Sequence, residues 1–180
     1  YPGDPAANEQ IDAGIKGHSW DRLKRSMRLK FRSSYGTAAW QTPLLQGAPL
    51  NAATATDTFD TLVLRAGNNR AWSRIWNPDA TDFTLDQLVR DSQVAIEGYG
   101  SHGTFAHLYI NGVYWGLYNP SERPDDEFAA SYFGGSADDW FYFKGDSSDP
   151  SQGGDETRWS YLTNTLTTKD LSVTANYAEM

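Results

Sequence analysis

The chain has 180 residues, of which 39% are hydrophobic and 14% aromatic, enough apolar content for the core of one domain or one lobe of a larger domain. The formal net charge of −8 argues against a general nucleic-acid binder, which needs a net basic surface, although a local basic patch remains open. The absence of cysteine excludes disulfides and thiolate chemistry, and no apolar run is long enough to span a membrane.

Residues 1–13 contain three helix- and strand-breaking residues (Pro2, Gly3 and Pro5) and few apolar anchors, so we expect a loose lead-in segment. The first residue is Tyr1 rather than Met, which indicates a processed chain or a piece of a longer one. We therefore expect one domain over residues 14–180.

Residues 26–32 alternate strictly between apolar and basic side chains, which predicts a strand with one face on a core. The apolar set is Met27, Leu29 and Phe31, and the basic set is Arg28, Lys30 and Arg32. The basic row is either a phosphate contact or an ordinary solvated face, and the pattern leaves both open. Residues 36–58 are rich in Ala, Thr, Pro and Gly and predict a long irregular connection, and residues 61–65 predict a second strand.

A helix is predicted from Thr84 to Gly98. Thr84 and Gln87 have the spacing of a capping box, with Phe83 and Leu88 at the positions of a hydrophobic staple. The expected core-facing stripe consists of Leu85, Leu88, Val89 and Ile96. Gly98 is placed to end the helix in a left-handed conformation.

A tight β-hairpin is predicted around Asn111-Gly112, because both central residues of a type I′ turn need positive φ. A two-residue loop then fixes the expected cross-strand pairs. On one face these are Ile110 with Val113, Leu108 with Trp115 and Ala106 with Leu117; on the other, Tyr109 with Tyr114, His107 with Gly116 and Phe105 with Tyr118. Gly116 is expected to leave an open space opposite His107.

The chain after the hairpin is predicted to be mainly helical. Pro124 and the acids that follow it predict a helix start, and Gly134-Gly135 predict its end. A short strand is expected over 140–144, a loop over 145–154, a helix around Trp159, Leu162 and Leu166, and a last helix capped by Ser172. Strands that precede helices favour an α+β class with an antiparallel sheet and packed helices.

Four segments in this order resemble the CotH kinase family, which is named for a spore-coat protein and is similar to a diverged, atypical protein kinase. They are residues 26–31 (SMRLKF), 60–67 (DTLVLRAG), 108–118 (LYINGVYWGLY) with Glu122, and 128–135 (FAASYFGG). The resemblance covers nearly the whole chain after residue 13. It implies the N-lobe and the start of the C-lobe of a kinase-like fold.

The resemblance also implies nucleotide-binding roles for particular residues. They are Lys16, Gly17, Arg28, Lys30, Asp86, Asn119 and Glu122. Lys16 and Gly17 lie in a small-residue loop that suits phosphates, although it lacks P-loop spacing. Arg28 or, preferably, Lys30 supplies the kinase-like cation. Asp86, preferred to Asp91, is the partner acid, although Leu85 stands where the family often has Arg. Residues 119–122 form the hinge beside an adenine.

By this resemblance the parent protein is an ATP- and Mg²⁺-dependent kinase of Ser or Thr hydroxyls in protein substrates, secreted or at the cell surface. The acids for catalysis and metal binding are expected beyond Met180, so we assign no catalytic or metal residue here and expect this chain alone to be inactive. Two alternatives remain: an extracellular carbohydrate-binding module that presents Trp and Tyr in one plane, and a non-catalytic scaffold of a coat or surface layer.

Other metal sites are not supported by the residue spacing. No HxH or HExxH pattern is present for zinc, and the acids over residues 146–156 miss the spacing of a calcium loop.

Overall fold

The protein was analysed as a computed structural model, which describes residues 12–14, 24–34, 36–46, 52–67, 82–142 and 156–178. The chain divides into two compact units, Tyr1–Pro124 and Asp125–Met180, and each is described by itself. The first unit carries an antiparallel sheet and one long helix, and the second is helical where it is described. The predicted α+β class is therefore confirmed.

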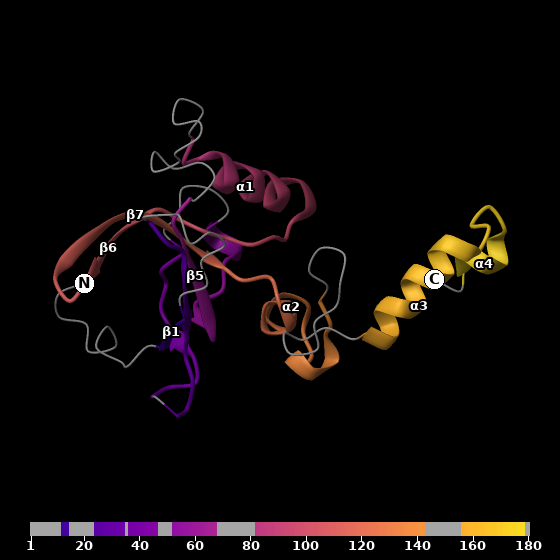
Figure 1. The fold of residues 1–180 in the computed structure, drawn as a ribbon, viewed down its shortest axis with the longest axis horizontal. Helices are drawn as coiled ribbons and strands as arrows, with labels where there is room; N and C mark the ends of the chain where they lie inside the picture. The colour runs from indigo at the N-terminus through magenta and orange to yellow at the C-terminus, as the bar shows by residue number, and fades with distance from the viewer. Residues whose placement is uncertain are drawn as a thin grey trace. The chain divides into compact units, whose positions relative to one another are not determined.

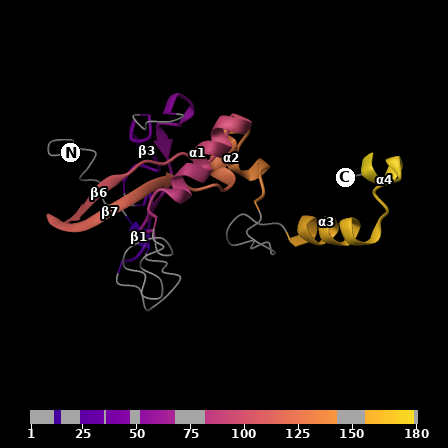
Figure 2. The same ribbon diagram turned by 90° about the horizontal axis from the view of Figure 1, so that it is seen from above.

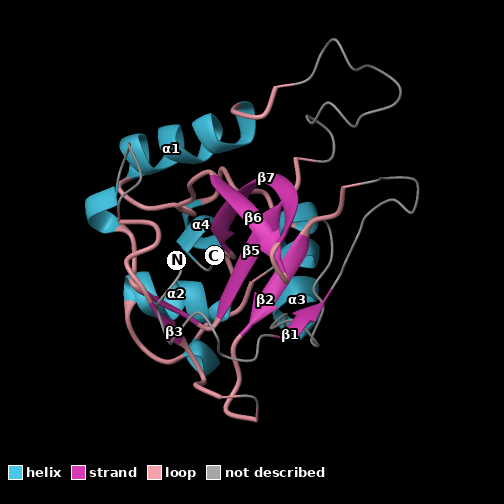
Figure 3. Cartoon of the chain, turned by 90° about the vertical axis from the view of Figure 1, so that its left-hand side faces the viewer, coloured by secondary structure: helices cyan, strands magenta, loops and turns pink. Residues whose placement is uncertain are grey.

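The main sheet of the first unit has five strands, and every neighbouring pair is antiparallel. In spatial order they are β1 (Asp12–Gly14), β2 (Met27–Lys30), β5 (Thr61–Arg65), β7 (Val113–Glu122) and β6 (Ala106–Ile110). Figure 3 shows β5 between β2 and β7, at the centre of the sheet. The strands predicted over 26–32 and 61–65 are both present.

The hairpin that joins β6 to β7 has the predicted type of turn, with Asn111 at φ 51° and Gly112 at φ 78°. The pairs nearest the turn are also as predicted. Beyond Tyr109 a bulge shifts the register, so that Leu108 lies opposite Gly116, and the four pairs predicted beyond the bulge are wrong. The bulge adds one residue to β7 relative to β6. Next to it, Gly116 has φ 116°, a conformation open mainly to glycine.

Residues 36–58 contain more regular structure than predicted. A second, two-stranded sheet pairs β3 (Trp40–Gln41) with β4 (Thr58–Phe59), and a 3₁₀ turn, η2, spans Ala52–Thr54. The β3–β4 segment supplies most of a hydrophobic cluster of Leu45, Ala55, Phe59 and Leu62. Elements this short give little periodic signal in the sequence, and tertiary packing forms them.

The apolar side of the main sheet forms a second cluster, made of Met27, Leu64, Ala66 and Tyr118. Leu29 packs against both clusters. The predicted inward face of β2 is therefore correct, with Met27 and Phe31 buried and Leu29 partly buried.

Helix α1 (Leu85–Glu97) has the predicted position and the predicted end, because the Gly98 N–H donates to the carbonyl of Val94 from a φ of 79°. The capping box is wrong: Thr84 makes no side-chain cap, and its own N–H is 2.7 Å from Asp82 Oδ1. The predicted apolar stripe is wrong as well, since Leu88 is 55% exposed and Ile96 is 83% exposed. The buried residues of the helix are Gln87 and Val94.

Figures 1 and 2 both show α1 running beside the C-terminal half of β7, the half farther from the hairpin turn. This strand half also pairs with β5. The helix therefore lies over the middle of one face of the sheet, and it presents a largely polar side to β5 and β7.

The second unit holds α2 (Asp126–Phe133), η4 (Ala137–Asp139), α3 (Glu156–Thr168) and α4 (Thr174–Ala178). Asp125 caps α2 by accepting from the Phe128 N–H at 3.3 Å, and Gly134 ends the helix at φ 83°. The strand predicted over 140–144 is absent from its described part, 140–142, where the Trp140 indole donates to the Gly134 carbonyl instead. No helix in the described part of the chain is long and apolar enough to cross a membrane.

Substitutions of Leu62 in β5 and Leu88 in α1 test which of these two side chains belongs to the hydrophobic core. Leu62→Ala removes a side chain with 0% exposure and should lower the free energy of unfolding by about 2–5 kcal/mol. Leu88→Ala removes an exposed side chain and should change it by less than about 0.5 kcal/mol. Urea unfolding measures both, and similar large losses would show that the outward stripe of α1 is buried after all.

Candidate functional site

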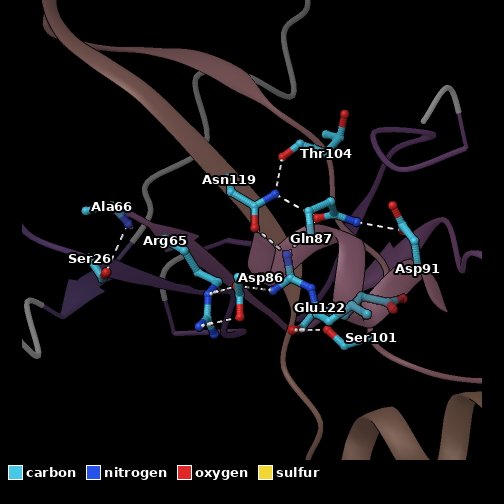
Figure 4. Close-up of polar contacts among 11 residues, drawn as sticks. Ser26, Arg65, Ala66, Asp86, Gln87, Asp91, Ser101, Thr104, Asn119 and Glu122 are labelled. Atoms are coloured by element: carbon cyan, nitrogen blue, oxygen red, sulfur yellow. Dashed lines mark hydrogen bonds and ion pairs between the residues drawn. The ribbon is translucent and has the colours of Figure 1, made fainter. Parts of the chain in front are cut away.

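The polar side of α1 meets two side chains that project from neighbouring strands. Arg65 of β5 and Asn119 of β7 are register partners, so their side chains leave the sheet on the same face. Asp86, Gln87 and Arg90 of α1 contact them. Figure 4 shows Asp86 beside Arg65 and Gln87 beside Asn119. These five residues form what we call the helix–sheet cluster.

An ion pair joins the last residue of β5 to the first turn of α1. Arg65 Nε lies 2.8 Å from Asp86 Oδ2, and a second guanidinium nitrogen donates to Oδ1 at 3.2 Å, which makes the contact bidentate. Both side chains are nearly half exposed, at 46% and 47%, so the pair adds little to stability. Its exposure leaves the remaining guanidinium donors open to a solvent-side ligand.

Asp86 also forms an ion pair with Arg90, one helical turn later, with 3.1 Å between Nη1 and Oδ2. The sequence singled out Asp86 as the acid, but it placed the partner cation on β2 and overlooked Arg65. The available signal was the position of Arg65, at the end of the strand that comes before the helix in the chain.

The buried half of the helix–sheet cluster is held by side-chain amides. Asn119 Nδ2 donates to Gln87 Oε1 at 2.8 Å and to the Thr104 carbonyl at 2.7 Å, while Asn119 Oδ1 accepts from Arg90. Arg90 also donates to Gln87 Oε1 at 2.6 Å, and Gln87 Nε2 donates to Asp91 at 2.8 Å. Burial lowers the pKa of the Arg90 guanidinium, an effect that the nearby carboxylate of Asp86 opposes.

The predicted basic row lies on this same face of the sheet. Arg28 pairs with Val63 and Lys30 with Thr61, and both partners share a face with Arg65 at alternate positions along β5. Burial lowers the pKa of Lys30, and the charges of Arg32, Arg28 and Arg123 lower it further. In a chain of net charge −8, these cations gather near Lys30, where the charge of Asp60 offsets part of their repulsion and a bound anion would offset more.

The predicted hinge residues lie inside β7, not beyond it. Glu122 pairs with Leu62 on one side, and on the other its N–H donates to the carbonyl of His102 at 3.0 Å. The Glu122 carboxylate is buried and lies 2.8 Å from the His102 ring and 2.7 Å from its backbone nitrogen. The strand therefore continues further than its Pro120 suggests, and the boundary between the two units comes after Pro124.

The remaining predicted residues have different outcomes. Lys16 and Gly17 lie outside the described residues. Asp91 accepts from Gln87 at the edge of the cluster. Gly116 does not face an open space, because a side chain there would lie 3.5 Å from Lys24 Cε, and Lys24 Nζ donates to the carbonyl of Leu117.

Neither a metal centre nor a flat sugar platform is supported by the described part of the chain. It contains no group of three or more His, Asp or Glu side chains that could hold a metal ion. Tyr109 and Tyr114 are exposed on the hairpin, but their ring planes are inclined by 47°. The arrangement that remains is an exposed, bidentate Arg–Asp pair beside a row of cations, which suits the binding of phosphate groups.

The family model described as CotH kinase protein matches residues 79–177, more than half of the chain. The match takes in α1 with Asp86, the hairpin and the helices of the second unit. It begins after β5, so Arg65 lies outside it. No curated protein and no solved structure matches the chain.

The close approach of Gly103 to the helix–sheet cluster gives a test of its packing. A Cβ at this position would press into Gln87 Oε1 and lie 3.0 Å from the Arg90 guanidinium and 3.1 Å from the Pro120 carbonyl. Gly103→Ala should therefore lower the free energy of unfolding by about 1–3 kcal/mol, measured by urea unfolding. Gly36→Ala is the control, because a Cβ at Gly36 meets nothing within 4 Å. Equal effects of the two substitutions would contradict the tight packing.

Proposed function

Because the chain belongs to the CotH kinase protein family, we propose that its first unit is the nucleotide-binding part of an ATP-dependent protein kinase. The proposed substrates are ATP and Ser or Thr hydroxyls of a protein, and the proposed location is secreted or at the cell surface. The family membership supports the kinase class, and the site geometry supports the placement of the nucleotide.

The observation that carries the proposal is the ion pair between Arg65 and Asp86. Protein kinases use a cation on the strand before a helix, paired with an acid on that helix, to hold the phosphates of ATP. In this chain Arg65 ends β5, and α1 with Asp86 is the next described element. We therefore assign the phosphate-binding role to Arg65, in place of the earlier preference for Lys30.

Arg28 and Lys30 become secondary phosphate contacts in this proposal. They share the face of Arg65, so an extended triphosphate could contact more than one of them. Asn119 and Glu122 take supporting roles, because their side chains are buried in contacts within the protein.

We assign no residue of this chain to Mg²⁺ or to proton transfer. The described residues do not offer the three clustered ligands that would fit a metal, so the cation would be held by the phosphates and by groups other than these. The proposal is therefore limited to nucleotide binding. A non-catalytic scaffold is the alternative, and the binding experiment below separates the two.

The nucleotide proposal predicts that Arg65→Ala weakens ATP binding by about tenfold or more, because a hydrogen bond to a charged group contributes roughly 1.5–3 kcal/mol. Isothermal titration calorimetry with ATP, with and without Mg²⁺, measures the dissociation constants. Lys169→Ala is the matched control, since it removes one positive charge from the second unit. Absence of ATP binding by the unaltered protein would instead favour the scaffold function.

A second prediction concerns pH. The pKa of Lys30 lies below its usual 10.5, because of burial and the neighbouring arginines, and a bound triphosphate should raise it. The contribution of Lys30 to ATP affinity should then be fully present below the pKa of Lys30 in the free protein. It should be lost as the pH rises from that value to the higher pKa of the ATP complex.

Lys30→Arg should remove this alkaline decline while keeping the affinity at pH 7, because arginine stays charged throughout the range. Titrations from pH 7 to above the ordinary lysine pKa of 10.5 measure the effect. The same decline in both proteins would exclude Lys30 as a phosphate contact.

A further inference from the structure

Helix α1 is attached to the sheet mainly by hydrogen bonds. Only one of its apolar side chains, Val94, is buried, and the other buried residue is Gln87. An amphipathic helix normally holds its place through an apolar stripe, but here Leu88, Val89 and Ile96 are exposed. The polar contacts of Gln87 and Arg90 with β7 must therefore fix where the helix lies along the sheet.

Asn119 is the residue on the sheet through which these contacts converge. Its side chain is buried, with a residue exposure of 8%, and its amide oxygen and amide nitrogen both have partners. The oxygen accepts from Arg90, and the nitrogen donates to Gln87 Oε1 and to the Thr104 carbonyl. An amide has two N–H donors and one carbonyl acceptor, so this set uses both ends of Asn119.

The contacts of Asn119 are linked to the ion pair by a single guanidinium. Arg90 donates to Asn119 from one terminal nitrogen and forms an ion pair with Asp86 through the second, and Asp86 in turn accepts from Arg65. Arg65 is the cross-strand partner of Asn119, so the chain of contacts closes on itself. Figure 4 shows the two ends of this circuit, with Asn119 beside Gln87 and Arg65 beside Asp86.

We infer that Asn119 is a positioning residue: with Gln87 and Arg90 it sets the register of α1 on the sheet, and thereby holds Asp86 opposite Arg65. The effect of Asn119 on nucleotide affinity rests on the proposed function. Its effect on the register of α1 is a property of the free protein and does not depend on that function. Asn119 does not touch the nucleotide in this account, because both ends of its amide are already bonded within the protein.

The substitution Asn119→Asp tests the role with almost no change in size. It keeps an acceptor for Arg90 but turns the donor nitrogen into an oxygen that faces the Gln87 and Thr104 carbonyl oxygens. We expect the amides of α1 to exchange with deuterium at least tenfold faster in the free protein, whereas those of β2 and β5 keep their rates. We also expect the Arg65 Nε–H to lose its protection in ¹⁵N NMR spectra, although Arg65 does not contact the substituted atoms.

Gln87→Leu is a second variant that gives the same test from the helix side. It removes the acceptor of Asn119 and Arg90 but keeps the helix propensity. Gln93→Leu is its matched control, because Gln93 lies on the same helix, is exposed and donates to Glu97 of that helix at 3.4 Å. We expect faster exchange of α1 in the first variant and unchanged exchange in the second.

A double-variant cycle separates positioning from a general loss of structure. If Asn119 acts through Arg65, the protein with both Arg65→Ala and Asn119→Asp should bind ATP no more weakly than Arg65→Ala alone. Independent, multiplying losses would overturn the inference, as would unchanged exchange of the Arg65 Nε–H in Asn119→Asp. If the unaltered protein binds no ATP, the proposed function fails, and the exchange rates alone decide the inference.

Discussion

The structure of the first unit depends on one constraint, the polar attachment of α1 to β5 and β7. Arg65 and Asn119 stand next to each other on one face of the sheet, and Asp86, Gln87 and Arg90 meet them from the helix. Hydrogen bonds are directional, so this set permits a single register, whereas an apolar stripe would tolerate sliding. The cost is the burial of the Arg90 charge, which Asp86 and the two amide oxygens offset.

This constraint explains how a chain of net charge −8 gathers basic side chains on one face of its sheet. Leu29, Leu62 and Leu64 fill the opposite face of the sheet, so the alternation of β2 and β5 sends Arg28, Lys30 and Arg65 to the side of the helix. Asp86 orients one of these cations without neutralising the row. Membership in the CotH kinase protein family supports the proposal that this arrangement holds the phosphates of a nucleotide.

Much of the fold could be predicted from local signals. The Asn111-Gly112 turn, the end of α1 at Gly98 and the strands β2 and β5 follow from φ requirements and alternation, and the structure contains all of them.

The predictions that failed have a common physical origin in tertiary contacts. Gln87 has the spacing of a capping residue, but it is drawn into bonds with Asn119, which is 32 residues away. A bulge beside Gly116 shifted the hairpin register, and β7 continued through Pro120 because its partner β5 extends alongside it. Asp86 could be chosen from the family resemblance of its helix, but its partner Arg65 became evident only once the strands were arranged in space.

The most direct measurement is a crystal structure of this chain with a non-hydrolysable ATP analogue. The account predicts phosphate oxygens within hydrogen-bonding distance of the Arg65 guanidinium, on the face of the sheet that carries Arg28 and Lys30, with Asp86 still paired to Arg65. An analogue bound elsewhere, with Arg65 and the basic row in contact only with solvent, would contradict it.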